Sequence, residues 1–346
     1  MGRVMTERRR RLGTTDMEIS SVGLGSWAIG GGGWAMSWGA QDDSDSVAAI
    51  QHAVGCGINW VDTAPIYGHG HSEEVVGRAV KGLPASQRPF IFTKCGLIWD
   101  ERDHYAQPKN ILRPESIRKE CEASLRRLGV DRIDLLQFHW PDQSGVPAEE
   151  SWGAMLELID EGKVRAGGVS NYGVDLLERC ASVGHVDSAQ PPFSLIRREA
   201  AADIIPWCDT HHTGVIVYSP LQAGLLTSRW TVDRVKALDP EDWRPKNDEF
   251  QSPKLERNLG LRDQLQPIAQ RHGTSVSSVA IAWLLAWPGV TGAIVGGRTP
   301  QQIDDWVTAM DVELSDVDLD EIAAAIRETG AGGGPERPPA EKNLMA

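Results

Sequence analysis

The stretch Trp60-Val61-Asp62-Thr63-Ala64-Pro65-Ile66-Tyr67-Gly68 determines how the rest of the chain is interpreted. Residues 58–61 form a short, largely apolar segment typical of a strand, and an aspartate, an Ala-Pro turn and a tyrosine follow it. Two further apolar segments also end in a polar side chain: Lys94 follows 90–93, and His139 follows 135–138. A carboxylate, a phenol, an ammonium and an imidazole at strand ends can together handle a proton. The candidate catalytic residues are Asp62, Tyr67, Lys94 and His139.

Predicted strands alternate with predicted helices along most of the chain. Apolar runs indicate strands at 22–25, 58–61, 90–93, 133–138, 166–169, 186–189, 215–218 and 293–295, and helical spacing indicates helices at 44–56, 72–80, 114–128, 147–160, 174–181, 200–210 and 276–285. Eight such units over about 250 residues predict a (β/α)8 barrel. A doubly wound open sheet is the alternative. It is disfavoured because residues 23–28 lack the third glycine of a dinucleotide-binding turn, and no helix follows them.

Several segments fall outside this alternation. Residues 10–12 and 17–19 flank a Gly-Thr-Thr-Asp turn and predict an N-terminal β-hairpin. Residues 221–260 predict a long, partly ordered loop after strand seven, and 315–327 a C-terminal helix capped by Ser315. We therefore predict a single domain over 1–328. The tail at 329–346 is rich in glycine, proline and charge, which predicts disorder.

Charge and cysteine content exclude several classes of protein. The net charge of −13 disfavours nucleic acid and anionic membranes as partners. No apolar run reaches the roughly 18 residues that span a bilayer, and the basic segment Met1–Arg11 is not followed by an apolar stretch, as a secretory signal would require. The five cysteines are scattered, which favours a reducing cytoplasm over a disulfide frame or a zinc site. His69 and His71 have no evident third ligand, so no metal is predicted. The oligomeric state is left open.

In a (β/α)8 barrel the carboxyl ends of the strands meet at one face, where the active site lies. Asp62, Lys94 and His139 are therefore expected to converge there, with Tyr67 just beyond the first. A tyrosine has a reference pKa of about 10. A neighbouring Lys94 ammonium is expected to lower the pKa of Tyr67, while Asp62 holds that lysine charged. The set could then give a proton to a carbonyl oxygen that receives a hydride.

The motif at 62–68 resembles the aldo-keto reductases, as do Leu24-Gly25-Ser26-Trp27, Gly168-Val169-Ser170-Asn171 and Tyr218-Ser219-Pro220-Leu221. The resemblance runs from about Leu12 to Arg327, and residues 69–74 and 138–142 are most similar to a bacterial branch of general-stress and inositol-operon reductases. It implies a (β/α)8 barrel, NADPH as cofactor, and reversible reduction of an aldehyde, ketone or sugar-like compound. It also implies Tyr67 as proton donor, Lys94 and Asp62 as its tuning pair, and His139 as the substrate-orienting group.

The cofactor residues are predicted partly from position. Loops after strands seven and eight often hold a phosphate, and here they span 219–225 and 296–302. Arg298 could pair with a 2′-phosphate, which favours NADPH over NADH. The resemblance adds Ser170, Asn171 and Gln190 as holders of the nicotinamide carboxamide, Tyr218 stacked on its ring, and Gln302 at the adenosine end. The predicted set is Ser26, Trp27, Asp62, Ser170, Asn171, Gln190, Tyr218, Ser219, Pro220, Leu221, Gly224, Leu225, Gly296, Arg298 and Gln302.

Other features leave alternatives open. Trp306 stands where the family often has an asparagine that touches adenine. Trp34, Trp99 and Trp140 fall in loops at the predicted mouth and are interpreted as lining a substrate pocket. Two rival functions remain: a nucleotide-sensing binding subunit with the reductase fold and little turnover, and a lyase that uses Lys94 as a Schiff-base amine.

Overall fold

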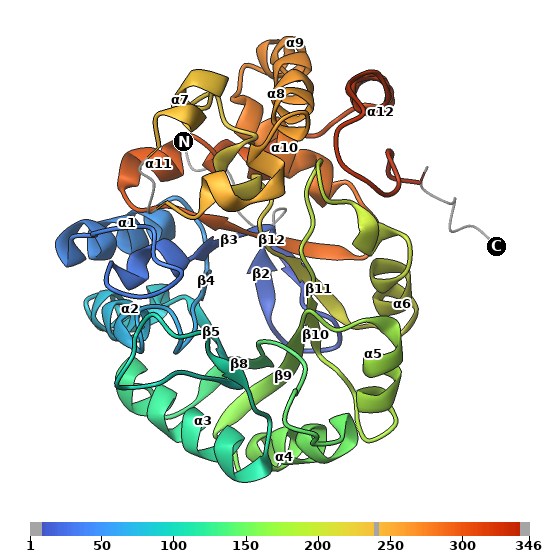
Figure 1. The fold of residues 1–346 in the computed structure, drawn as a ribbon. Coiled ribbons are helices and arrows are strands. Elements are labelled where there is room, and N and C mark those ends of the chain that lie inside the picture. Colours follow the sequence, from blue (N-terminus) through green and yellow to red (C-terminus); the bar gives the residue numbers. More distant parts are fainter. Residues whose placement is uncertain (1–8, 239–241, 340–346) are drawn as a thin grey trace.

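The computed structural model describes residues 9–238 and 242–339, and in these ranges eight parallel strands close into a barrel (Figure 1). Its strands, in order around the ring, are β10 (Ser188–Gln190), β11 (Gly214–Val217), β12 (Val290–Gly296), β3 (Val22–Gly25), β4 (Trp60–Asp62), β5 (Phe90–Cys95), β8 (Ile133–Phe138) and β9 (Val164–Ser170). The predicted (β/α)8 barrel is confirmed.

Helices surround the strands as a ring, which Figure 1 shows along the barrel axis. The helices between and after the strands are α1 (Asp43–Gly55), α2 (His71–Lys81), α3 (Pro114–Leu128), α4 (Ala148–Asp160), α5 (Val174–Ala181), α6 (Ile204–Thr210), α10 (Val276–Leu285), α11 (Pro300–Asp304) and α12 (Asp316–Thr329). Local signals set several of their ends. The Ser315 side chain caps α12 in a capping box, and the left-handed Gly129 (φ 67°) ends α3.

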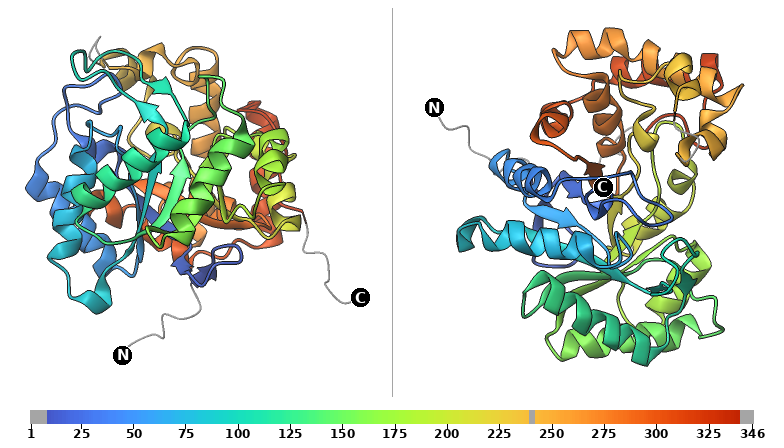
Figure 2. Two further views of the ribbon diagram at one scale, coloured as in Figure 1. Left: turned by 90° about the horizontal axis from the view of Figure 1, so that it is seen from below. Right: turned by 60° about the vertical axis from the view of Figure 1, so that its left-hand side comes forward.

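The barrel interior is apolar at the end where the strands begin, and the N-terminal hairpin closes that end. Trp60, Phe92 and Leu135 point inward from three neighbouring strands. Leu12, Met17 and Ile19, from and beside the hairpin strands β1 (Arg9–Arg11) and β2 (Glu18–Ser20), pack beneath them with no exposed surface. The left view of Figure 2 shows this hairpin at the end of the barrel away from the strand carboxyl ends. The hairpin thus seals one mouth and leaves the other open.

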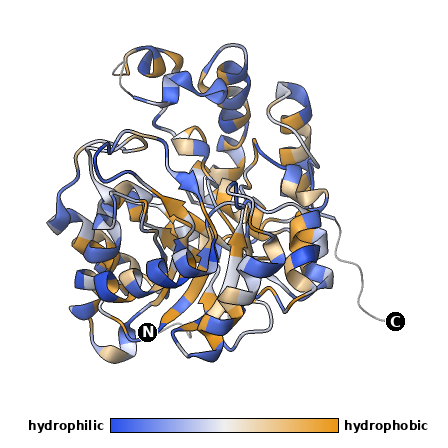
Figure 3. Ribbon diagram, turned by 60° about the horizontal axis from the view of Figure 1, so that its bottom comes forward, coloured by the Kyte–Doolittle hydropathy of each residue, from blue (hydrophilic) through white to orange (hydrophobic). Residues whose placement is uncertain are grey.

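A second apolar layer joins the strands to the helices. Strand side chains that alternate with the inward-facing ones, such as Val61 and Leu136, pack against buried faces of the helices. Figure 3 shows hydrophobic strands inside and hydrophilic residues on the outer helix faces. Burying both faces of parallel strands fits their nearly continuous apolar sequences.

Gly70 (φ 99°) occupies the cap position of α2, and the Ser72 hydroxyl lies 2.8 Å from that of Ser26. In the segment predicted as a long loop, residues 221–238 and 242–260 contain several short helices. They include α7 (Val232–Lys236), two short 3₁₀ helices (Arg244–Lys246 and Asp248–Phe250) and the start of α8 (Lys254–Gln264), which continues into α9 (Gln266–Arg271). Trp230 packs edge-to-face on Phe250, and both rings join the main hydrophobic core.

The predicted disorder from residue 329 does not hold for 330–339. The buried Arg198 donates hydrogen bonds to the carbonyl oxygens of Ala331 and Gly334, and Arg337 pairs with Asp316 and Asp320 of α12. These polar contacts compensate for the low apolar content on which the prediction rested. Residues 340–346 lie outside the described residues. So do residues 1–8 of the basic N-terminal segment, whereas 9–11 form β1.

Two expectations from composition can be compared with the structure. Within the described ranges, none of the helices combines the length and apolar character that crossing a membrane requires. All five cysteines lie in these ranges as free thiols, four of them buried.

A partly buried carboxyl group supports the carboxyl end of β5. Glu120 of α3 accepts a hydrogen bond from the Gly96 amide at 2.9 Å, two residues beyond Lys94. Burial raises the pKa of Glu120 from 4.5 to about 7, although the bonds from Gly96 and Ser116 partly oppose this. Between pH 4.5 and pH 7, Glu120 is therefore protonated to a greater extent in the folded protein than in the unfolded chain.

This shift predicts a pH-dependent stability that a Glu120→Gln variant lacks. Between pH 4.5 and 7 the native state binds more protons at Glu120 than the unfolded state, so stability falls as the pH rises. We expect the stability of the wild type, measured relative to Glu120→Gln by denaturant titration, to fall by about 3 kcal/mol across this window. Parallel stability profiles for the two proteins would contradict the assignment.

Candidate active site

The four candidate catalytic residues converge at the open mouth of the barrel. The Lys94 ammonium lies 2.5 Å from Asp62 Oδ1, 3.0 Å from the Thr63 carbonyl oxygen and 3.3 Å from the Tyr67 hydroxyl. The ring of His139 packs edge-on against the ring of Tyr67, with centroids 5.7 Å apart. The three N–H groups of the lysine thus have three acceptors, one of them the phenol oxygen.

Strand register explains this convergence. Side chains alternate between the two faces of a strand, so residues two positions beyond an inward-facing one also point inward. Asp62 lies two residues beyond Trp60, and Lys94 two beyond Phe92, on strands that pair directly. The inward-facing side chains of these two strands are therefore apolar at the closed end of the barrel and charged at the open end. The turn that carries Tyr67 is held by close backbone contact between Gly68 (φ 66°) and Gly30.

Burial controls the protonation of this cluster. Lys94 has no exposed surface and Asp62 is 3% exposed. Burial lowers the pKa of Lys94, and the Asp62 carboxylate raises it again in part. Burial also holds the pKa of His139 well below its usual range, with the Lys94 charge adding to the effect. His139 is therefore neutral near pH 7, so one ring nitrogen can donate a hydrogen bond and the other can accept one.

The sequence predicts a lowered pKa for Tyr67, whereas its surroundings in the structure raise that pKa. Burial raises the pKa of Tyr67 well above its ordinary value, and the Asp62 carboxylate raises it further. Lys94 does not overcome these effects, because Asp62 neutralises its charge at close range. The phenol is thus protonated at neutral pH. Since its oxygen already accepts a bond from Lys94, its own proton is free to point into the mouth.

The residues predicted to hold a nicotinamide form one hydrogen-bonded network. Gln190 donates to Asp62 Oδ2 at 2.9 Å, so the aspartate is bound on both oxygens. Asn171 donates to the His139 carbonyl oxygen at 2.9 Å and accepts from the Tyr218 hydroxyl at 2.7 Å. The Ser170 hydroxyl donates to the Gln190 carbonyl oxygen at 2.9 Å. The network ties the ends of β8, β9 and β10 to the ion pair.

A cavity of about 700 Å³, here called the mouth cavity, opens above this cluster. It lies within the usual range for ligand sites. Most predicted site residues line it: Trp27, Asp62, Tyr67, His139, Trp140, Ser170, Asn171, Gln190, Tyr218, Ser219, Pro220, Leu221, Gly224, Gly296, Arg298 and Gln302.

Five predicted residues do not reach this wall. Lys94, Ser26 and Leu225 are fully buried beneath it, and Ser26 bonds to Ser72. Trp34 is 2% exposed and donates to the Gly31 carbonyl oxygen, while Trp99 stacks on His69. Trp34 and Trp99 therefore make packing contacts. Of the three tryptophans predicted to line a substrate pocket, Trp140, which is 43% exposed, is the one that lines the mouth cavity.

Sequence reasoning missed a tryptophan–arginine cover over the mouth cavity. Trp243 stacks on Trp27 at 6.1 Å and meets Trp38 edge-on at 5.4 Å. The Arg244 guanidinium lies over the rings of Trp38 and Trp230. The sequence signal was the tryptophan content of 221–260, but nothing in a single sequence shows that this insertion folds back onto the glycine- and tryptophan-rich segment at 30–39.

The predicted phosphate-binding loop is ordered by its own side chains. Thr299 caps α11, and the Gln302 side chain accepts a hydrogen bond from the Arg298 amide at 2.9 Å. The Arg298 guanidinium donates to the Gln41 side chain and to the Trp38 and Ala40 carbonyl oxygens. Trp306 is 2% exposed and lines the cavity beside this loop.

Comparison with known proteins then identifies the chain. The sequence model of the aldo/keto reductase family matches residues 21–327. The chain belongs to the aldo/keto reductase family. As an oxidoreductase of this family, it carries its polar cluster where a (β/α)8 enzyme has its active site. The family resemblance drawn from the sequence motifs is confirmed, and members of this family use nicotinamide cofactors.

Its relatives are similar over nearly their full length. The chain is 36% identical over 327 residues to the NADH-specific methylglyoxal reductase of Escherichia coli, covering 91% of this chain and 98% of that one. It is 37% identical over 291 residues to the aldo-keto reductase YhdN of Bacillus subtilis, covering 84% and 85%. The glycerol dehydrogenase of Gluconobacter oxydans has a TM-score of 0.86 at 35% identity, covering 98% and 100%.

Breaking the buried ion pair is predicted to destabilise this reductase strongly. In Asp62→Asn the Lys94 charge loses its counter-ion in a site without solvent, which typically costs about 3–5 kcal/mol. The free energy of unfolding, from denaturant titration, should fall by that order. The double variant Asp62→Asn/Lys94→Met should recover part of the loss, because both charges are then absent. Stability of Asp62→Asn within about 1 kcal/mol of the wild type would contradict this energetic account.

Proposed function

We propose that this aldo/keto reductase is an NADPH-dependent enzyme that reversibly reduces an aldehyde or ketone to an alcohol, acting in the cytoplasm. The observation that carries the proposal is the Tyr67 hydroxyl at the floor of the mouth cavity, 3.3 Å from a buried ammonium. Its protonated state at neutral pH suits a proton donor.

Each residue of the cluster has a distinct task. Tyr67 donates its proton to the carbonyl oxygen of the substrate as negative charge develops there. Lys94 stabilises the phenolate that remains, and Asp62 holds Lys94 in place through its charge. His139, neutral and beside Tyr67, offers one ring N–H to the same carbonyl oxygen and so orients it. These groups act at fixed positions, so little reorganisation is needed at the moment of reaction.

The mouth cavity fits a nicotinamide nucleotide. The Gln190 side-chain oxygen receives no hydrogen bond from the described residues, so it could accept one from a carboxamide, with Tyr218 beside it. At the other end Gly296 leaves open space where a side chain would stand, next to the Thr299 cap of α11, which suits a phosphate. When bound, the reduced nicotinamide supplies the hydride.

Arg298 supports the choice of NADPH. Among the residues that the structure describes, its guanidinium bonds only to uncharged oxygens, those of Gln41, Trp38 and Ala40. A 2′-phosphate dianion is a stronger acceptor than an amide oxygen and could replace these partners. The Escherichia coli relative is named as NADH-specific, so a preference for NADH is the competing outcome.

Two of the relatives are named for small oxygenated substrates, the methylglyoxal reductase and the glycerol dehydrogenase. We propose a substrate of similar kind, small or sugar-like, because polar side chains and tryptophans share the wall of the mouth cavity. The rival lyase function is disfavoured because Lys94 is fully buried and bound to Asp62, which leaves no free amine for a Schiff base. The rival sensing function predicts nucleotide binding without turnover.

Tyr67→Phe is predicted to abolish most turnover. Loss of the general acid should lower kcat for aldehyde reduction by roughly a hundred- to ten-thousandfold. Nicotinamide absorbance measures this rate, and nucleotide binding measured by fluorescence titration should change little. If the variant kept full carbonyl reduction, Tyr67 would not be the proton donor.

Arg298→Ala is predicted to weaken NADPH selectively. Loss of a charge-assisted pair with the 2′-phosphate should raise the dissociation constant for NADPH by about tenfold or more, with NADH nearly unaffected. Equilibrium titration with both nucleotides measures this, and NADH controls for loosening of the loop at 38–41. An unchanged ratio of the two constants would refute the 2′-phosphate role.

A further inference from the structure

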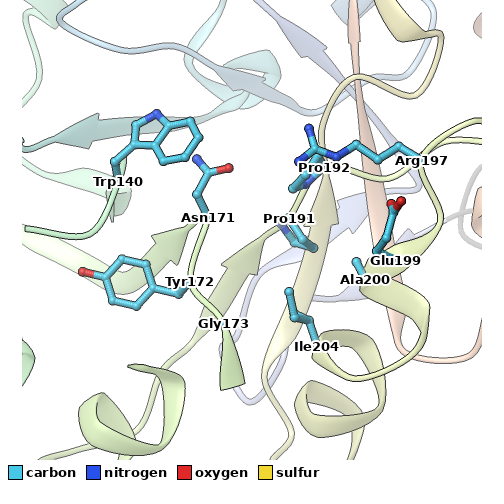
Figure 4. A pocket seen from close by; sticks show the side chains of 10 residues that line it. All are labelled: Trp140, Asn171, Tyr172, Gly173, Pro191, Pro192, Arg197, Glu199, Ala200 and Ile204. Atoms are coloured by element: carbon cyan, nitrogen blue, oxygen red, sulfur yellow. The ribbon is translucent and has the colours of Figure 1, made fainter. Parts of the chain in front are cut away.

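A second cavity of about 460 Å³, here called the side pocket, adjoins the mouth cavity (Figure 4). Trp140, Asn171 and Arg197 line both cavities, so the two meet at these side chains. Figure 4 shows the three along one edge of the side pocket, with the Arg197 side chain extending past Pro192 towards Asn171. A bound molecule that reached from the mouth cavity into the side pocket would pass the Arg197 guanidinium.

The backbone of Arg197 is held in place. Its amide donates to the Ser194 hydroxyl at 2.9 Å, and its carbonyl oxygen accepts from the Ser194 amide at 2.9 Å. It also forms a parallel bridge with Gly333, in the segment that the buried Arg198 anchors. The side chain therefore leaves a fixed point of the fold.

The guanidinium of Arg197 is exposed, and among the described residues it makes no hydrogen bond or ion pair. The four other arginines that line the mouth cavity are engaged: Arg229 with Asp305, Arg234 with the Arg229 carbonyl oxygen, Arg244 with Asp242, and Arg298 with loop carbonyl oxygens. Glu199 also lines the side pocket, but its carboxylate lies against Gly333. Arg197 is thus a free cation at the edge of a cavity.

The position of Arg197 assigns it to the substrate end of the site. Its charge lowers the pKa of Tyr218, against the larger rise that burial causes. Tyr218 bonds to Asn171, at the end of the cavity proposed for the nicotinamide. The insertion at 221–260 carries Arg229 and Arg244, and the predicted phosphate-binding loop at 296–302 carries Arg298. Arg197 is therefore separate from the groups suited to the phosphates of the cofactor.

We propose that Arg197 binds an anionic group, a carboxylate or a phosphate, on the substrate of this enzyme. The carbonyl carbon would lie at Tyr67 and His139, and the chain would pass Trp140 to place its charged end at the guanidinium. The inference rests on the proposed function and narrows its substrate class to carbonyl compounds that carry a negative charge a few carbons from the reacting centre.

Two physical arguments support this assignment. A guanidinium presents paired N–H groups that match the two oxygens of a carboxylate or phosphate. The chain as a whole carries a charge of −13, so its long-range field repels anions, and an anionic substrate needs a local cation for productive binding. A substrate that spans the two cavities would displace water from the pair and so strengthen it.

Matched substrate pairs test the proposal: 4-oxobutanoate against butanal, and glyceraldehyde 3-phosphate against glyceraldehyde. We expect the wild type to have a higher kcat/KM for at least one anionic member, and the pair that shows this distinguishes carboxylate from phosphate. Arg197→Ala should lower kcat/KM for that member by about tenfold or more, mainly through KM, and leave the neutral member nearly unchanged. Arg197→Lys should retain part of the preference.

Glu199→Gln is the matched control, because it changes a neighbouring charge of the same pocket and should preserve the preference for the anion. Equal losses for charged and neutral substrates in Arg197→Ala, or no loss for either, would overturn the proposal. If no carbonyl compound were reduced with either nucleotide, the proposed function would fail separately. Calorimetric binding of 4-hydroxybutanoate and of glycerol 3-phosphate to the oxidised-nucleotide complex would then decide. Binding of either by the wild type and not by Arg197→Ala would support the anion site, and equal binding or none would refute it.

Discussion

The ion pair between Lys94 and Asp62 is the constraint on which the open end of the barrel depends. Both groups are removed from water, so each requires the other. Their 2.5 Å contact joins the side chains of β4 and β5 at the point where the barrel interior turns polar. The remaining oxygen of Asp62 binds Gln190, and the remaining donors of Lys94 bind Thr63 and Tyr67. One charge pair thus holds residues from three separate segments of the chain: the stretch 60–68, β5 and β10.

The same pair explains why the tyrosine is protonated. A free ammonium beside a phenol favours the phenolate, but here Asp62 neutralises the ammonium and burial penalises a second negative charge. The phenol therefore keeps its proton until charge develops on a neighbouring oxygen. Lys94 then lies ready to stabilise the phenolate that forms. The arrangement favours proton transfer during the reaction over ionisation before it.

Much of the fold could be predicted because it depends on local patterns. The strand–helix alternation, the Gly129 stop and the Ser315 cap are encoded by a few adjacent residues, and the inward direction of Asp62 and Lys94 follows from strand periodicity. The tail at 330–339 was mispredicted because its order comes from Arg198, which is distant in sequence. The roles of Trp34 and Trp99, the cover formed by Trp243 and the free charge of Arg197 likewise depend on contacts between distant loops. Periodicity carries no information about such contacts.

Neutron diffraction from crystals of the nucleotide complex at neutral pH would test the central claim most directly, because it locates the exchangeable hydrogen atoms. The account predicts a deuterium on the Tyr67 hydroxyl, three on the Lys94 nitrogen, none on Asp62 and one on the ring of His139. A phenolate at Tyr67, or a neutral lysine beside a protonated Asp62, would contradict it.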